Sequence, residues 1–102
     1  MHKSIKLVEN PDDAEIETIP HPVEAAGGDT LSWKSDEGEI RVIFANPHPF
    51  DTPTPPELFA KKGHNTAEVR IRQDVGAGQH FDYVVSVDGR APKAVYGIDI
   101  KP

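Results

Sequence analysis

The chain has 102 residues, 36% of them hydrophobic, and its 17 acids and 11 bases give a formal net charge of −6. This length suits one domain, residues 1–102, with a single modest core. Ten prolines and eight glycines favour short strands and turns over long helices. The acidic balance argues against a nucleic-acid-binding protein, because contacts to phosphates need a basic surface.

The sequence contains no cysteine, which excludes disulfides, zinc–thiolate sites and thiol nucleophiles. Residues 1–13 lack the apolar run of a signal peptide, and no stretch has the length of a membrane span. We therefore expect a soluble, cytoplasmic protein that does not contact a membrane.

Three short strands are predicted in the first quarter of the chain. Residues 4–8 alternate apolar and polar side chains and are followed by turn-forming residues at 10–12. Residues 15–19 are a second candidate, and residues 23–25 are a short edge strand. Pro20 and Pro22 exclude a central strand between them, since proline cannot donate to a β-ladder.

Residues 28–44, GDTLSWKSDEGEIRVIF, predict a β-hairpin around which the domain is organised. Leu31 and Trp33 alternate with polar residues, and 35–38 have the composition of a turn. Residues 41–44 resume as a β-branched and aromatic strand. Trp33, the only tryptophan, is expected to fill the core of a small two-layer β domain.

A proline-rich loop follows at residues 46–65, NPHPFDTPTPPELFAKKGHN. Its five prolines argue against a regular strand, and loops of this length are often functional. Within it, residues 56–61 predict one helical turn, with Pro56 early and Gly63 after the end.

Three strands complete the chain. Residues 66–72 alternate, with Ala67, Val69 and Ile71 on one face. Residues 80–87 are the strongest strand candidate, and its apolar face consists of Phe81, Tyr83, Val85 and Val87. A glycine turn at 74–79 precedes that strand, Asp88-Gly89 follows it, and 94–100 form the last strand. About seven strands with this turn spacing predict an all-β antiparallel sandwich.

Three of these segments resemble the cupredoxin-like fold, the Greek-key sandwich of plastocyanins and their relatives. Residues 28–33, GDTLSW, look like the family's G-D-T-hydrophobic-x-W strand. Gly78 with 81–85, FDYVV, looks like its glycine turn and aromatic-x-aromatic-x-Cys strand, and 97–100, GIDI, looks like its closing strand. The resemblance covers residues 23–44 and 66–102 and implies the same scaffold.

The family's copper ligands, two His, one Cys and usually a Met, are missing from this sequence. Val85 stands where the resemblance places the thiolate, and the first histidine would fall near Ile40 or Arg41. His80 is the last histidine and Met1 the only methionine. A blue-copper centre needs a soft sulfur ligand with imidazoles. The resemblance thus implies a copper-free scaffold without electron-transfer chemistry, and no cofactor is expected.

Histidines at the two ends of the loop are the candidates for a different metal site. If the loop folds back, His48 and His64 could gather with Asp51 and Glu57 into a zinc or nickel site, although the spacing matches no tight metal motif. The simpler interpretation is that these histidine side chains are exposed to solvent and bind no metal. His80 with Asp82 is expected to face solvent.

No arrangement of residues predicts catalysis. The four serines stand in no nucleophile elbow, and the acid pairs lie in polar turns, where nothing in the sequence suggests the burial that acid–base catalysis by a carboxyl group needs. We expect that the protein is not an enzyme, and no residues can be named for a small hydrolase or isomerase.

The apolar residues of the loop are Phe50, Leu58 and Phe59, and residues 53–56 fit the P-x-x-P pattern. The phenylalanines either cap one end of the sandwich or present an apolar surface to a protein partner. We interpret the chain as a non-catalytic binding or accessory module with these three residues as contact candidates. The alternative is a metal-binding protein that uses the loop histidines. The sequence leaves the partner and the oligomeric state open.

Overall fold

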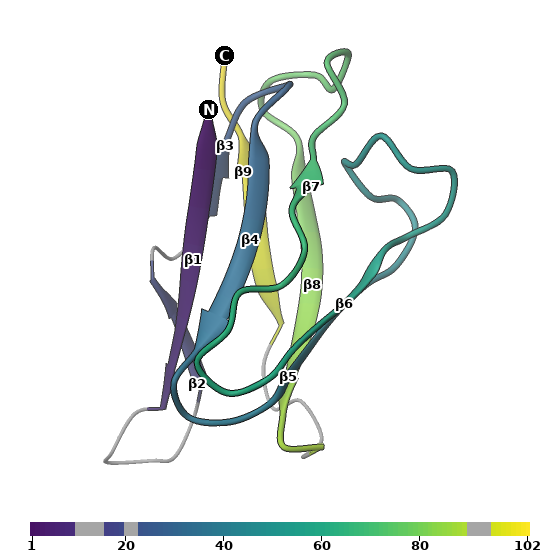
Figure 1. The fold of residues 1–102 in the computed structure, drawn as a ribbon. Helices are drawn as coiled ribbons and strands as arrows, with labels where there is room; N and C mark the ends of the chain where they lie inside the picture. The colour runs from purple at the N-terminus through teal and green to yellow at the C-terminus, as the bar shows by residue number, and fades with distance from the viewer. Residues whose placement is uncertain (10–15, 20–22, 90–94) are drawn as a thin grey trace.

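Strands and loops alone make up the part of the chain that the computed structural model describes, residues 1–9, 16–19, 23–89 and 95–102 (Figure 1). The strands are β1 (His2–Glu9), β2 (Ile16–Ile19), β3 (Val23–Ala25), β4 (Thr30–Ser35), β5 (Ile40–Phe44), β6 (Glu57–Ala60), β7 (Val69–Arg70), β8 (His80–Val87) and β9 (Tyr96–Ile100). The all-β class is as predicted. These residues include no helix long and apolar enough to cross a membrane.

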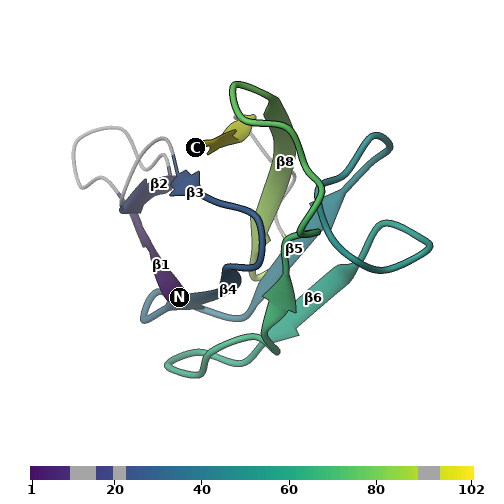
Figure 2. The same ribbon diagram turned by 90° about the horizontal axis from the view of Figure 1, so that it is seen from above.

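The strands form two sheets, in the order β2-β1-β4-β7 and β3-β9-β8-β5-β6. Seen from above, the two sheets face one another across a common interior (Figure 2). One cluster of buried apolar side chains fills that interior, with contributions from both sheets. Most neighbours are antiparallel, but β1 pairs with β4 and β3 with β9 in parallel, which a purely antiparallel sandwich would not contain.

The strands with clean alternation lie where the sequence places them. β8 spans the predicted residues, and its predicted apolar face, Phe81, Tyr83, Val85 and Val87, is buried. β1 extends the predicted 4–8 strand in both directions, and β3 is the predicted 23–25 strand. Asp88 and Gly89 both have positive φ, as the predicted turn requires. Residues 10–12 and 20–22 lie outside the described part of the chain.

The predicted hairpin at 28–44 is wrong, because its two strands belong to different sheets. β4 pairs with β1 on one side and with β7 on the other, so neither of its edges is left for β5. β5 pairs instead with β6 and β8. The segment 36–39 therefore crosses from one layer to the other. The Asp88 carboxylate fixes this crossing by accepting a hydrogen bond from the Glu39 N–H (2.9 Å).

Trp33 is fully buried, as expected of the residue that fills the core. Its ring packs edge-on against Phe44 and Tyr83, with centroid separations of 5.6 and 5.5 Å. Its indole N–H donates to the Tyr83 hydroxyl (3.2 Å), which satisfies the one polar atom of the side chain. The tryptophan thus joins the two sheets, since β4 and β8 lie in opposite layers.

The proline-rich segment 46–65 contains a strand, β6, where the sequence predicts irregular loop and a helical turn. Leu58 and Ala60 are buried while Glu57 and Phe59 are exposed, the alternation of a strand. Pairing with β5 decides the outcome, because Val42 lies opposite Leu58 and supplies the backbone partners that an isolated turn lacks. The predicted 66–72 strand is shorter than expected, with only Val69–Arg70 in β7.

Candidate functional site

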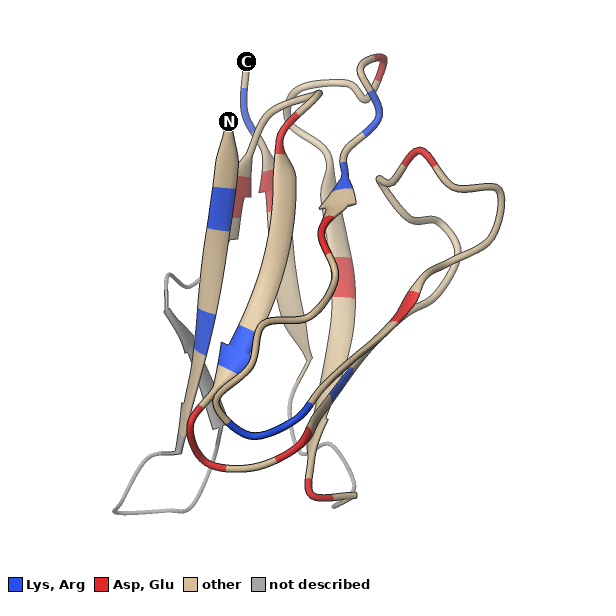
Figure 3. Ribbon diagram, in the orientation of Figure 1, with Lys and Arg blue, Asp and Glu red and all other residues tan. Residues whose placement is uncertain are grey.

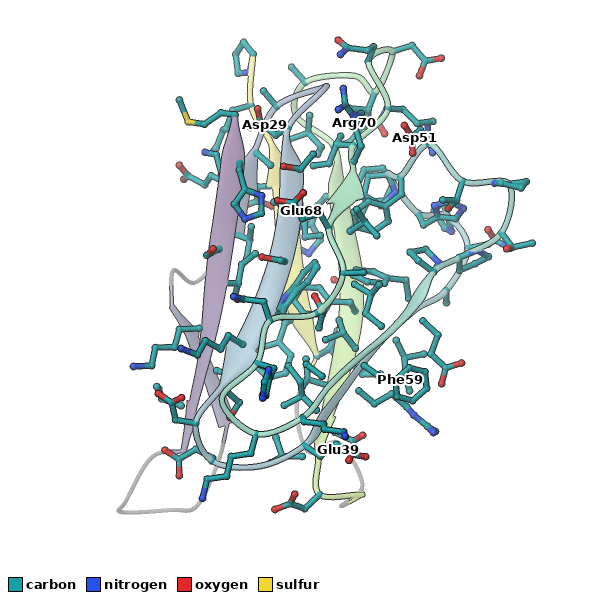
Figure 4. The ribbon with its side chains drawn as sticks, viewed as in Figure 1. Asp29, Glu39, Asp51, Phe59, Glu68 and Arg70 are labelled. Carbon is teal, nitrogen blue, oxygen red and sulfur yellow. The ribbon has the colours of Figure 1, made fainter. Side chains whose placement is uncertain are left out.

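The three apolar residues of the 46–65 segment take different positions. Phe50 is fully buried and Leu58 is nearly so, whereas Phe59 is 52% exposed. Only Phe59 therefore meets the expectation of an apolar side chain presented at the surface. Figure 4 shows its ring projecting from β6 away from the sandwich. The alternative, in which both phenylalanines cap the sandwich, holds for Phe50 alone.

Phe50 is drawn into the core by backbone pairing on either side of it. Arg72 N–H donates to the Pro49 carbonyl (2.8 Å) and Asp51 N–H donates to the Arg70 carbonyl (3.1 Å). The Phe50 ring then packs edge-on against Phe44, with centroids 4.7 Å apart. The first part of the proline-rich segment is thus held in place by backbone hydrogen bonds to residues 70–72.

The Arg41 side chain packs over the Phe59 ring on the outer face of the sheet, and Glu57 pairs with Arg41. Arg41 lies opposite Phe59 on β5, with the guanidinium carbon 4.7 Å from the ring centroid. Arg41 Nε lies 3.2 Å from a Glu57 carboxylate oxygen. A guanidinium over an aromatic face contributes about 0.5–1 kcal/mol at an exposed site. The ring is exposed and yet has a defined position.

The two loop histidines are not brought together. β5 and β6 are antiparallel, with Ile43 opposite Glu57 and Ile40 opposite Ala60. His48 follows the end of β5 and His64 follows the end of β6, so they leave opposite ends of the strand pair. The described residues contain no group of three His, Asp or Glu side chains placed to hold a metal ion.

His48 serves a structural role in its loop. It is buried, its ring stacks on Phe50, and its Nδ1 accepts from the Phe50 N–H (3.3 Å). Burial lowers the pKa of His48 below its usual value, and the nearby charge of Arg72 adds to the shift. The neutral imidazole is therefore favoured, which the hydrogen bond from Phe50 requires.

An open groove lies between residues 48–53 and 70–74. Arg72 crosses it, donating to the carbonyls of His48 and Phe50, and its Nε lies 3.6 Å from an Asp74 carboxylate oxygen. Figure 4 shows Asp51 and Arg70 on the two facing segments. Two arginines and two aspartates line the groove, so it has no net preference for an anion or a cation.

Of the positions that the resemblance aligns with copper ligands, Ile40 and Val85 lie in the core. The register pairs Val42 with Val85 and Ile40 with Val87, and all four aliphatic side chains are at most 3% exposed. Arg41 points outward toward Phe59. Aliphatic side chains carry no donor atoms, so these residues do not fit a copper ion.

His80 forms a cluster that the sequence predicts only in part. The expected pair with Asp82 is present on the exposed face of β8, with Nε2 and Oδ1 2.8 Å apart. Asp99 of β9 also bonds Nδ1. Hydrogen bonding to Asp99, and then to Asp82, raises the pKa of His80. Asp99 lies seventeen residues beyond Asp82, so only the β8–β9 register could have identified it.

A second polar cluster is centred on His2, which lies between Glu68 and Ser32. Its Nδ1 is 3.0 Å from a Glu68 oxygen and its Nε2 is 3.2 Å from Ser32 Oγ. This order of carboxylate, imidazole and hydroxyl is that of a hydrolytic triad. Ser32 is 2% exposed, however, so its oxygen is not presented to a substrate. The cluster ties β1, β4 and the segment before β7 together.

No protein-family model matches the sequence, and no curated protein matches it either. The function is therefore inferred from the geometry of the chain itself.

Proposed function

We propose that the chain is a non-catalytic binding module on a copper-free, cupredoxin-like Greek-key scaffold, and that it contacts a protein partner through the 46–65 segment. Two features support the scaffold. The segments that carry the resemblance fall on β4, β8 and β9, strands of a two-layer sandwich. The connections from β4 to β5 and from β6 to β7 cross between the layers, and connections between the two sheets are a feature of Greek-key sandwiches.

The observation that carries the proposal is the exposed ring of Phe59. The large apolar side chains that are exposed among the described residues are Met1, Phe59 and Val95, and Phe59 is the one aromatic among them. Aromatic and arginine side chains together dominate the binding energy of protein interfaces. Because Arg41 and the β-ladder already fix the ring, a partner loses little of its binding energy in ordering it.

A capture experiment tests the proposal. The purified chain is immobilised and exposed to a lysate of its source cells, in parallel with Phe59→Ser and Val95→Ser variants. Val95 is the matched control, because it is 61% exposed and lies outside the 46–65 segment. Circular dichroism first confirms that all three proteins fold.

We expect a protein that is retained by the wild type and by Val95→Ser and is lost with Phe59→Ser. Retention of the same proteins by all three forms would show that Phe59 makes no contact, and the proposed surface would then be wrong.

A further inference from the structure

One edge of the larger sheet is open at β6. β5 occupies one side of this strand, and no strand in the described part of the chain pairs with its other side. Alternate backbone N–H and C=O groups of β6 therefore point outward, where an added strand would bind them. Beyond the pairing with β5, residues 57–60 make no backbone hydrogen bond to the rest of the described chain.

The side chains along this edge are arranged in a self-complementary order. Glu57, Phe59 and Lys61 follow one another at the two-residue period of a strand, all exposed. Leu58 and Ala60 face the core. Figure 3 shows the charge order directly, with acid at the start of β6 and base beyond its end.

We propose that β6 pairs antiparallel with β6 of a second copy of this chain, about a twofold axis at Phe59. This arrangement sets Glu57 opposite Lys61 of the second copy, and Lys61 opposite the second copy's Glu57. The two Phe59 rings meet at the centre, and Leu58 lies beside Ala60 of the second copy. An isologous interface requires this self-complementarity, and a single antiparallel register satisfies every outward-facing pair.

The pairing joins two five-stranded sheets into one continuous sheet. Two of the other edge strands, β7 and β3, are less suited to pairing with a second copy. β7 has only two residues, and β3 presents one outward side chain, Glu24, which already pairs with Lys101 at 3.7 Å.

The four residues of β6 bury a small area, so the dimer is weak, with a Kd of about 10–100 μM. The inference rests on the proposed function, because it names the partner of the same surface.

Charge reversal tests the register. Glu57→Lys and Lys61→Glu each place like charges opposite one another twice in the dimer, and each is expected to weaken dimerisation about tenfold or more. A mixture of the two variants restores both opposite-charge pairs, because lysines at 57 and 61 then face glutamates at 61 and 57. The double variant Glu57→Lys/Lys61→Glu restores them within one protein. Lys62→Glu makes the same charge change outside the pairing and is the control.

Sedimentation equilibrium between about 10 μM and 1 mM measures all of these proteins, since this range brackets the expected Kd. Circular dichroism checks that each variant is folded, which matters most for Glu57→Lys because Glu57 also pairs with Arg41. We expect a similar Kd for the wild type, Lys62→Glu, the double variant and the mixture, and a Kd raised about tenfold or more for each of the two single variants alone.

A wild type that is monomeric at about 1 mM would overturn the dimer. So would single charge reversals that leave the Kd of the dimer unchanged, or a mixture that associates no more tightly than either single variant alone. The proposed function has a separate readout. A different protein captured in a Phe59-dependent manner would leave the binding module standing even where the dimer is refuted.

Discussion

Replacing the two phenylalanines of the proline-rich segment one at a time should have opposite consequences. Phe50 is fully buried and packs against Phe44, so Phe50→Ala leaves a cavity in the core. Such truncations cost about 3–5 kcal/mol of the free energy of unfolding. Phe59 is half exposed and its main contact is the Arg41 guanidinium. Phe59→Ala should therefore cost about 1 kcal/mol or less.

These free energies convert into shifts of the melting temperature. An unfolding entropy of about 2.1 cal/mol/K per residue gives roughly 0.2 kcal/mol/K for this chain. Phe50→Ala is then expected to lower Tm by about 15–25 °C, and Phe59→Ala by about 5 °C or less.

Thermal melts followed by circular dichroism, with urea unfolding as a second measurement, give both values. The reasoning would be refuted by a Phe50→Ala variant that melts within about 5 °C of the wild type, or by equal losses for the two variants. Either result would mean that the backbone pairing of residues 49–51 with 70–72 does not hold the Phe50 ring in the core.

Three further predictions concern buried and titrating groups. Tyr83→Phe leaves the Trp33 indole N–H without the acceptor it has in the core and should lower the free energy of unfolding by about 1–3 kcal/mol, measured by urea unfolding. The pKa of His80 is raised by its bond to Asp99, so its stabilising contribution is complete below the unfolded pKa of about 6.5 and is lost as the pH rises through the raised value. His80→Asn should remove this decline from a plot of the urea midpoint against pH, and an unchanged plot would contradict the assignment. His48 acts in the opposite sense, because burial lowers its pKa: stability should fall as the pH drops from about 6.5 through the lowered value, and His48→Gln should remove that fall.

Alternation of apolar side chains was sufficient to place β8, but it could not decide which strands pair. The hairpin predicted at 28–44 puts Leu31, Trp33 and Val42 on one apolar face. A crossing between layers puts the same side chains into the same core from opposite sides. The local sequence is equally compatible with both. The pairing of β4 is determined by β1 and β7, which occupy its two edges and are distant from it in the sequence.

The candidate site was predictable as a segment and not as a set of side chains. Pro56 and Gly63 have the positions of helix boundaries, and four residues are too few to distinguish a period of 2 from one of 3.6. Phe50 and Phe59 differ little in local composition. What separates them is the pairing of residues 49–51 with 70–72, a contact across about twenty residues that no local pattern encodes.

In the proposed interface, Phe50 anchors the segment in the core and Phe59 is the side chain that a partner would contact. Because Phe50 and the Arg72 hydrogen bonds fix the start of the segment, and the β5 ladder fixes its end, the Phe59 ring stands on a rigid strand and not on a free loop. A rigid aromatic loses little conformational entropy on binding, and an open β-edge beside it supplies backbone hydrogen bonds in a defined direction. The same two features would also favour aggregation if the edge were long and uniformly apolar. Glu57 and Lys61 bracket the ring with opposite charges, which in the proposed dimer favour a single antiparallel register and limit that risk.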